Sequence, residues 1–208
     1  MKRNLMIVVL LSAMFVAAGA FGIRPGKANA SPVAPKRNSA TAGLQDFNDA
    51  DVQRAELGLS LSPVPLGQIG FGRSRILVGL GSYLVITSGC NDCHTNPSYL
   101  PGNDPFMGQP EKINAAGFLA GGMQFGPFTS RNLTPDPTEG NLPAGLTLDE
   151  FIHVMRTGED LDKVHPQFGP LLQVMPWPAY GKKTDLDLEA IWNYLLHIPH
   201  VDTPKPTT

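Results

Sequence analysis

Both cysteines of this 208-residue chain lie in the stretch GCNDCHTN, residues 89–96, and a histidine follows the second cysteine directly. Cys90 and Cys93 are separated by two residues, and His94 is the next residue along the chain. Three kinds of site use such a cluster: a redox-active dithiol, half of a zinc site, and the attachment point of a covalently bound haem. Each kind requires a different fold around this stretch, so the choice among them constrains the whole chain.

The first thirty residues predict export from the cytoplasm. Lys2 and Arg3 give the first four residues a positive charge, residues 5–23 form an apolar run, and Ala28-Asn29-Ala30 has the small-x-small pattern of a cleavage site. The run is longer than most signal-peptide cores, and without cleavage it would contact or cross the membrane through residues 5–23. We therefore expect an exported, periplasmic protein, either released or anchored and facing the periplasm.

Charge argues against nucleic acid as a partner. Removal of residues 1–30 would leave 12 Lys and Arg residues against 18 Asp and Glu residues, a formal charge of −6. A surface of this sign repels phosphate backbones and favours encounter with a positively charged protein. The same acidity is also explained by the solubility of an exported protein. About 178 residues would remain, which is enough for one domain.

Helical periodicity is the main secondary-structure signal. Three stretches have apolar residues at the three- and four-residue spacing of a helix: Arg75 to about Ser88, Leu148 to Thr157, and Asp185 to about His197. The second opens with the capping-box pair Thr147 and Glu150, and the third opens with Thr184 and Asp187. No alternating run predicts a strand, so the expected fold class is all-α.

Two segments lack this periodicity. Residues 31–74 predict an irregular N-terminal arm, and residues 97–145, rich in Gly and Pro turn signals, predict a long loop. The expected organisation is a signal peptide or anchor (1–30), the irregular arm (31–74), a compact domain (75–200) and a tail (201–208). A loop of almost fifty residues is unusual in a compact domain unless it has a functional reason to exist.

Two of the three sites fit the cluster poorly. A thioredoxin-type dithiol lies at a strand-to-helix junction, whereas these cysteines follow a predicted helix in a chain without predicted strands. A structural zinc site needs four ligands, and the chain has no third cysteine. The other histidines form no second tight cluster: His153, His165, His197 and His200. A disulfide between the two cysteines would leave His94 unexplained.

Cys-x-x-Cys-His is the attachment sequence of c-type haem. The two thiols reach the two vinyl groups of one porphyrin, and the adjacent histidine becomes the proximal ligand of the iron. We therefore predict one covalently bound haem c, held by Cys90, Cys93 and His94. A haem also accounts for the long loop, because irregular segments can wrap a macrocycle that serves as their core.

A second axial ligand decides whether such a haem transfers electrons or binds small molecules. Four methionines follow residue 30: Met107, Met123, Met155 and Met175. Met155 lies on the apolar face of a predicted helix and is expected in the core. Met175 precedes Pro176, which stiffens the chain just before the last helix. We predict Met175 as the ligand, with Met123 and then His165 as alternatives.

The order of these features resembles the class I c-type cytochromes over residues 75–199. Three further stretches are similar to the haem modules in cytochrome subunits of bacterial membrane-bound alcohol and sugar-acid dehydrogenases: NLTPD at 132–136, RTG at 156–158 and MPWPAY at 175–180. Those subunits usually carry three haem motifs, and this chain carries one. Resemblance to their modules therefore does not establish membership of a dehydrogenase complex.

The resemblance implies a small cytochrome c fold whose first and last helices cross beside an apolar haem crevice. Gly79 and Gly81 would permit close approach of Trp192 or Tyr194 at that crossing. Candidates for contact with the haem are Trp177, Tyr180 and Asn132. For the two aromatic residues, a place in the core is an equal alternative to hydrogen bonding with haem propionates.

These features predict an exported monohaem cytochrome c that transfers single electrons and is not itself an enzyme. Its expected partner is a redox protein, either a dehydrogenase or a terminal oxidase. Two alternatives remain open: a fixed relay subunit of a membrane-bound dehydrogenase complex, and a haem peroxidase or gas sensor with an open sixth position.

Overall fold

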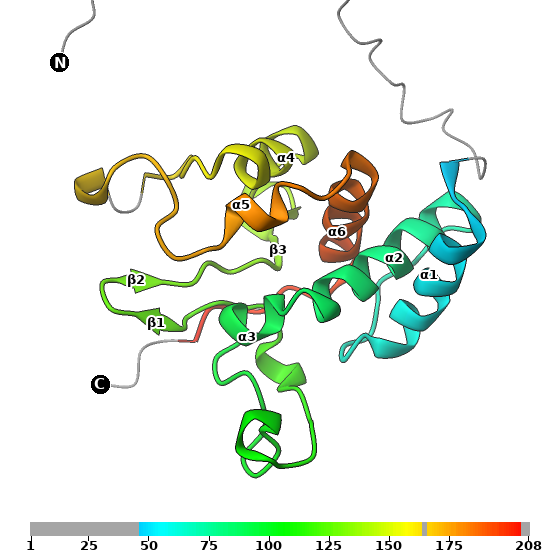
Figure 1. Ribbon diagram of the computed structural model, residues 1–208, viewed down its shortest axis with the longest axis horizontal. Helices are drawn as coiled ribbons and strands as arrows, with labels where there is room; N and C mark the ends of the chain where they lie inside the picture. The colour runs from blue at the N-terminus through cyan, green and yellow to red at the C-terminus, as the bar shows by residue number, and fades with distance from the viewer. Residues whose placement is uncertain (1–45, 164–165, 205–208) are drawn as a thin grey trace, which may run out of the picture. The chain divides into compact units, whose positions relative to one another are not determined.

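The computed structural model describes residues 46–163 and 166–204, all of which belong to one compact unit of the chain, residues 39–208 (Figure 1). The predicted signal peptide or anchor, residues 1–30, lies outside the described residues. Among the helices that are described, none is long and apolar enough to cross a membrane. The predicted boundaries between domains stay predictions.

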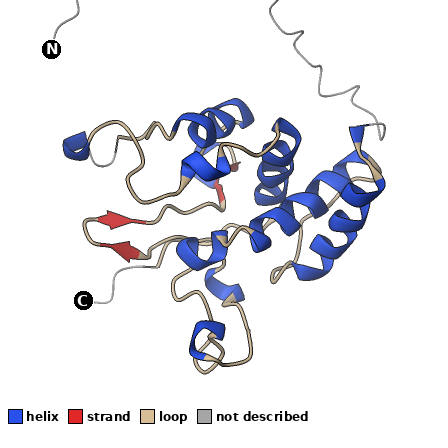
Figure 2. Ribbon diagram, in the orientation of Figure 1, coloured by secondary structure: helices blue, strands red, loops and turns tan. Residues whose placement is uncertain are grey.

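The described unit is helix-rich, as predicted (Figure 2). Its α-helices are α1 (Asp49–Leu61), α2 (Arg73–Thr87), α3 (Cys90–His94), α4 (Leu148–Thr157), α5 (Trp177–Tyr180) and α6 (Asp185–His197). Single 3-10 turns are η2 (Pro105–Met107), η3 (Ala115–Gly117), η4 (Pro137–Glu139) and η5 (Pro166–Phe168). Two antiparallel pairs are formed by β1 (Gln124–Phe125) with β2 (Phe128–Thr129) and by β3 (Pro135–Asp136) with β4 (Leu142–Pro143). Strands of two residues have no period that a sequence pattern could show.

The three predicted helices correspond to α2, α4 and α6. At the start of α4 the hydroxyl of Thr147 accepts from the Glu150 N–H, and the Glu150 carboxylate accepts from the Thr147 N–H. Thr184 and Asp187 cap α6 in the same way. Both capping boxes were predicted, and both satisfy backbone donors that the first helical turn leaves unpaired.

The prediction of an irregular arm over residues 31–74 is wrong for α1 and for the first two residues of α2. Helix α1 is capped by Asn48, whose side chain accepts from the Asp51 N–H. The buried positions of α1 include Ala55 and Gly58. Periodicity is read from large apolar residues. Because α1 packs through small ones, its helical pattern was missed.

Helix α2 lies between α1 and α6 and contacts both through glycines. A Cβ on Gly79 would lie 2.3 Å from the carbonyl oxygen of Ala55 in α1, and a Cβ on Gly81 would lie 1.9 Å from that of Ala190 in α6. The predicted approach of Tyr194 is confirmed, since its Cβ would lie 2.7 Å from the same added atom on Gly81. Trp192 has another role, because its Nε1 donates to the carbonyl oxygen of Leu146.

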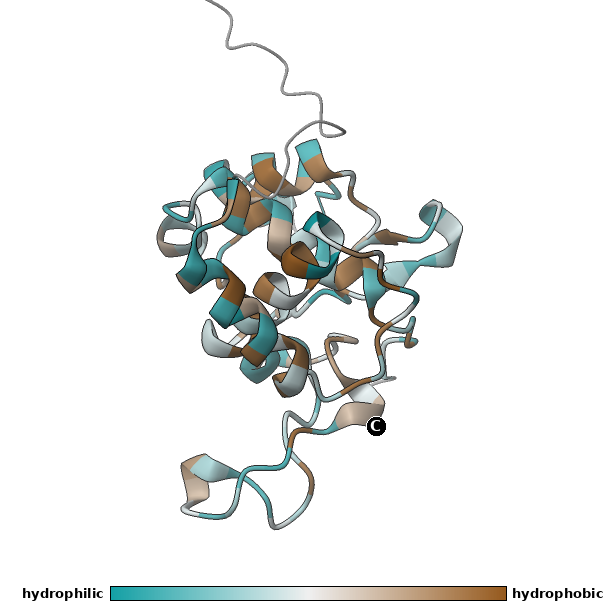
Figure 3. Ribbon diagram, turned by 90° about the vertical axis from the view of Figure 1, so that its right-hand side faces the viewer, coloured by the Kyte–Doolittle hydropathy of each residue, from teal (hydrophilic) through white to brown (hydrophobic). Residues whose placement is uncertain are grey.

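The long loop, residues 97–145, is part of the core rather than a cover over it. Phe118 and Leu119 are almost fully buried, and apolar residues occur in the loops as well as in the helices (Figure 3). The Leu119 N–H donates to the Thr95 hydroxyl, and the Gly121 N–H donates to the carbonyl oxygen of His94. The loop is therefore anchored directly to the end of α3.

Candidate haem site

Helix α3 places the three motif residues on one face. Helix α2 ends at Thr87, and Gly89, with a φ of 70°, gives the left-handed turn that redirects the chain into α3. Cys90, Cys93 and His94 are then at positions i, i+3 and i+4, which are neighbours on a helix surface. The spacing in the sequence thus becomes a cluster of two thiols and an imidazole.

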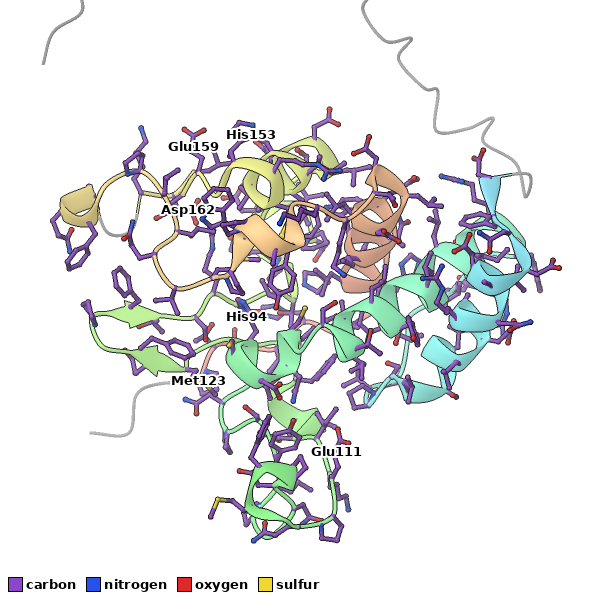
Figure 4. All side chains as sticks on the ribbon, in the orientation of Figure 1. His94, Glu111, Met123, His153, Glu159 and Asp162 are labelled. Carbon is purple, nitrogen blue, oxygen red and sulfur yellow. The ribbon has the colours of Figure 1, made fainter. Side chains whose placement is uncertain are left out.

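The imidazole of His94 is oriented by the backbone. Its Nδ1 lies 2.8 Å from the carbonyl oxygen of Arg131, which can only accept, so Nδ1 carries the proton and Nε2 keeps its lone pair. Burial lowers the pKa of His94, which favours the neutral ring that metals bind. Figure 4 shows His94 on the side of α3 that faces α5. A histidine fixed in this way has the orientation and the ring hydrogen bond that are typical of metal-binding histidines.

The two cysteines are free thiols. Burial raises the pKa of Cys90 to about 12, and burial and then the Asp92 carboxylate raise the pKa of Cys93. Both are therefore protonated at neutral pH and are not activated as a redox dithiol would be. Within the described ranges no three His, Cys, Asp or Glu residues are grouped so as to hold a metal ion.

One cavity of about 230 Å³ opens beside this cluster and is lined by both cysteines and by His94. Apolar walls come from distant parts of the chain, including Val85, Leu133, Phe151 and Leu195. Met175 and Tyr180 line the same cavity. The structure therefore brings together five of the predicted site residues around one space.

The other methionines differ in whether they line this cavity. Met155, predicted as a core residue, is 5% exposed and also lines it. Met123 is not among the lining residues and lies beside the start of β1 (Figure 4), and Met107 is 73% exposed. His165 lies outside the described residues. Sequence reasoning treated core positions and ligand positions as separate, whereas Met155 is buried in the core and also lines the cavity.

Two residues that were predicted to contact the cofactor, Asn132 and Trp177, do not line the cavity. The Asn132 amide donates to the carbonyl oxygen of Val201, and its Oδ1 accepts from the Thr134 N–H and hydroxyl. Asn132 thus fixes the residues that follow α6. Trp177 covers Gly158, where an added Cβ would lie 2.2 Å from the indole. Neither residue lines the cavity.

Tyr180 does line the cavity, but its hydroxyl has a protein partner. The hydroxyl donates to the carbonyl oxygen of Ser88 at 2.9 Å, which links α5 to the end of α2. Burial raises the pKa of Tyr180, so it remains a donor at physiological pH.

Basic residues also belong to the wall of the cavity, and sequence reasoning missed Lys183 among them. Arg131 and Lys183 line the cavity, as does Asp160, which pairs with Arg131 at 3.8 Å. Arg131 also pairs with Asp162. Apart from its three charged residues the lining is largely apolar. Arg131 and Lys183 suit the two carboxylates of a haem, and the thiols, the imidazole and the thioether of Met175 suit its vinyl groups and iron. The residues present therefore fit a haem c.

Comparison with known proteins also indicates similarity to cytochromes c. The chain is 33% identical over 139 residues to the fructose dehydrogenase cytochrome subunit of Gluconobacter japonicus. The aligned residues make up 64% of this chain and 24% of that subunit. It is 30% identical over 123 residues to the gluconate 2-dehydrogenase cytochrome c subunit of Pantoea cypripedii, covering 58% of this chain and 23% of that subunit. The resemblance predicted from the motifs is confirmed.

A third relative is the cytochrome c subunit of the quinone alcohol dehydrogenase of Gluconacetobacter polyoxogenes, 30% identical over 121 residues, or 58% of this chain and 22% of that subunit. No family model matches the chain. The chain spans about a quarter of the length of these relatives.

Proposed function

We propose that the chain is an exported electron carrier that binds one haem c covalently through Cys90 and Cys93. His94 and Met175 would be the residues that bind its iron. The observation that carries the proposal is the shared cavity: His94 with its oriented imidazole, Cys90, Cys93 and Met175 line one largely apolar space. A bound haem supplies reversible one-electron chemistry at its iron.

The chain's own residues would hold and tune that group. The carbonyl oxygen of Arg131 fixes the ring of His94, and Arg131 and Lys183 place positive charge at the wall of the cavity. The apolar lining excludes water, which makes these charges more effective than they would be in solvent. Met175 is preferred over Met155 because Pro176 restrains its loop, whereas Met155 is packed within α4.

The relatives support a place beside a dehydrogenase. All three named relatives are cytochrome subunits of dehydrogenases, so we propose a periplasmic dehydrogenase, acting on an alcohol or sugar-derived substrate, as the electron donor. This chain would be the relay and not the catalytic subunit. The relatives lend no support to a terminal oxidase as the partner.

A peroxidase or gas sensor is the competing function. It would need an open sixth position and, for peroxide chemistry, an acid-base group near the iron. Among the described residues that line the cavity, His94 is the single histidine, and two methionines line it as well. These observations favour a closed, six-coordinate iron.

Optical spectra of the protein matured in an exporting host test the proposal. A carrier should give low-spin spectra in both oxidation states, a weak near-infrared sulfur-to-iron band when oxidised, and no reaction of the reduced form with carbon monoxide. A high-spin reduced form that binds carbon monoxide rapidly would support the sensor or peroxidase instead. Protein that carries no covalent haem would contradict both.

A further inference from the structure

The segment that carries Met175 forms a thin wall between the cavity and solvent. We call residues 166–176 the strap. Gln173, Val174 and Pro176 are exposed to solvent and line the cavity at the same time. An electron that enters or leaves through the strap would cross one layer of side chains, and the probability of electron transfer falls steeply with the thickness of intervening protein.

Large apolar side chains lie on the outer side of this wall. Phe168, Leu171 and Val174 are 44%, 42% and 43% exposed, and we call them the strap patch. The ring of Phe168 lies 5.0 Å from that of Phe128 on β2. Apolar residues gathered on one surface are typical of sites that bind another protein.

Backbone hydrogen bonds hold the strap in place. The Leu172 N–H donates to the carbonyl oxygen of Gly158, and the Asp160 N–H donates to that of Pro170, both at 2.7 Å. Glu159 and Leu171 form an isolated antiparallel bridge. The patch is therefore presented by a fixed segment, which reduces the entropy that binding would cost.

Charge distinguishes the patch from the unit that carries it. Residues 46–204 contain 9 Lys and Arg residues and 18 Asp and Glu residues, a formal charge of −9. Close to the patch the balance is nearly neutral: Glu159, Asp160 and Asp162 are opposed by Lys163 and Arg131. A long-range negative field would attract a cationic partner, while the contact itself would be apolar.

We propose that the strap patch is the docking surface for a redox protein of net positive charge that presents an apolar contact of its own. This inference rests on the proposed function and adds the surface and the chemistry of the partner. It assigns exposed apolar residues elsewhere, such as Phe71, Phe106 and Met107 at 97%, 77% and 73% exposure, no part in docking.

Stopped-flow electron exchange tests the proposal. The probe is a blue-copper protein whose copper lies beneath an apolar surface, in one version of net positive charge and one of net negative charge. Bleaching of the copper band is well separated from the haem bands. The reduced haem protein should react at least about tenfold faster with the positive probe at low salt, and the advantage should disappear at high salt.

Substitutions locate the contact. Leu171→Ser should slow exchange with the positive probe by about tenfold, and Phe168→Ser should act in the same direction. Neither residue lines the cavity. The matched controls are Met107→Ser and Phe106→Ser; Phe106 stands against Tyr99 much as Phe168 stands against Phe128. The controls should change the rate by less than about twofold.

Hexaammineruthenium(II), which needs no apolar contact, separates the possible failures. It should reduce the oxidised haem of every variant at the rate of the unchanged protein. If the haem reacts with this ion but the control pair slows the copper protein more than the strap pair does, the docking proposal is wrong and the proposed function stands. If no reducible haem is present, the proposed function itself fails. Sedimentation showing a dimer that Leu171→Ser dissociates would assign the patch to a second copy of the chain and would also overturn the proposal.

Discussion

The carbonyl oxygen of Arg131 accepts a hydrogen bond from the imidazole of His94, and the guanidinium of the same arginine pairs with Asp160 and Asp162. One residue thus connects the predicted proximal ligand with the segment that precedes the strap. Because Arg131 also lines the cavity, its charge acts on whatever the cavity holds. The backbone of Arg131 fixes the ligand, and its side chain sets the local charge.

Replacement of that charge should lower the reduction potential of the haem. Arg131→Gln removes a cation beside the cavity and leaves Asp160 and Asp162 unopposed, so reduction of the iron becomes less favourable. Potentiometric titration at low ionic strength measures the change. Arg75→Gln is the control, because Arg75 pairs at the surface with Glu56 on α1. Equal potentials for both variants would show that Arg131 does not act on the iron.

Haem attachment should require both thiols. Mass spectrometry of protein matured in an exporting host should show the chain plus one haem that survives denaturation, because each cysteine supplies one thioether. Cys90→Ala combined with Cys93→Ala should lose the covalent haem and unfold at much lower temperature, since the cavity would lose its contents. Wild-type protein with a Cys90–Cys93 disulfide and no haem would contradict the assignment.

Met155 and Met175 both line the cavity, so the ligand prediction is tested by comparing these two methionines. Met175→Ala should abolish the near-infrared sulfur-to-iron band of the oxidised protein and open the iron to carbon monoxide when reduced. Met175→His should stay low-spin with a lower potential, because the neutral thioether favours ferrous iron.

Met155→Leu and Met123→Ala are the controls for this comparison. Met155→Leu keeps the volume of a buried side chain that lines the cavity and should retain the band. Met123→Ala should retain it as well, since Met123 does not line the cavity. Loss of the band in Met155→Leu but not in Met175→Ala would transfer the ligand to α4.

Contacts of α2 should be sensitive to a single added methyl group. Gly81→Ala places a Cβ 1.9 Å from the Ala190 carbonyl oxygen, so the free energy of unfolding should fall by about 1–3 kcal/mol despite the better helix propensity of alanine. Gly79→Ala should act similarly through Ala55 of α1. Thermal denaturation of the haem-bound protein measures both.

Gly67→Ala provides the comparison. Its added Cβ would lie 3.4 Å from the His197 carbonyl oxygen, so the change should stay within about 0.5 kcal/mol. Equal stability of the Gly81 and Gly67 variants would contradict the close crossing of α2 and α6.

The parts of the fold that sequence predicted are those with local signals. The helices α4 and α6 begin at capping boxes, and α2 has a dense apolar pattern before Gly89. The spacing of Cys90, Cys93 and His94 likewise implies one helix face. These features depend on residues within one or two helical turns of each other, so the amino-acid sequence alone is enough to predict them.

What was missed depends on contacts between distant segments. The motif NLTPD suggested Asn132 as a cofactor contact, yet its amide is used by Val201, sixty-nine residues later. The role of Arg131 at His94 involves a backbone carbonyl, which no side-chain pattern can encode. The pairing of α1 with α2 relies on Ala55 and Gly79, which let the two helices approach closely because they have almost no side chain.

The glycine contact between α1 and α2 limits how the module can be recombined with other proteins. A fusion that begins at residue 75, where the predicted domain starts, would delete α1 and leave the face of Gly79 and the apolar side chains around it open to water. A graft into a multihaem subunit or onto an electrode-binding tag should therefore join the chain upstream of the Asn48 cap.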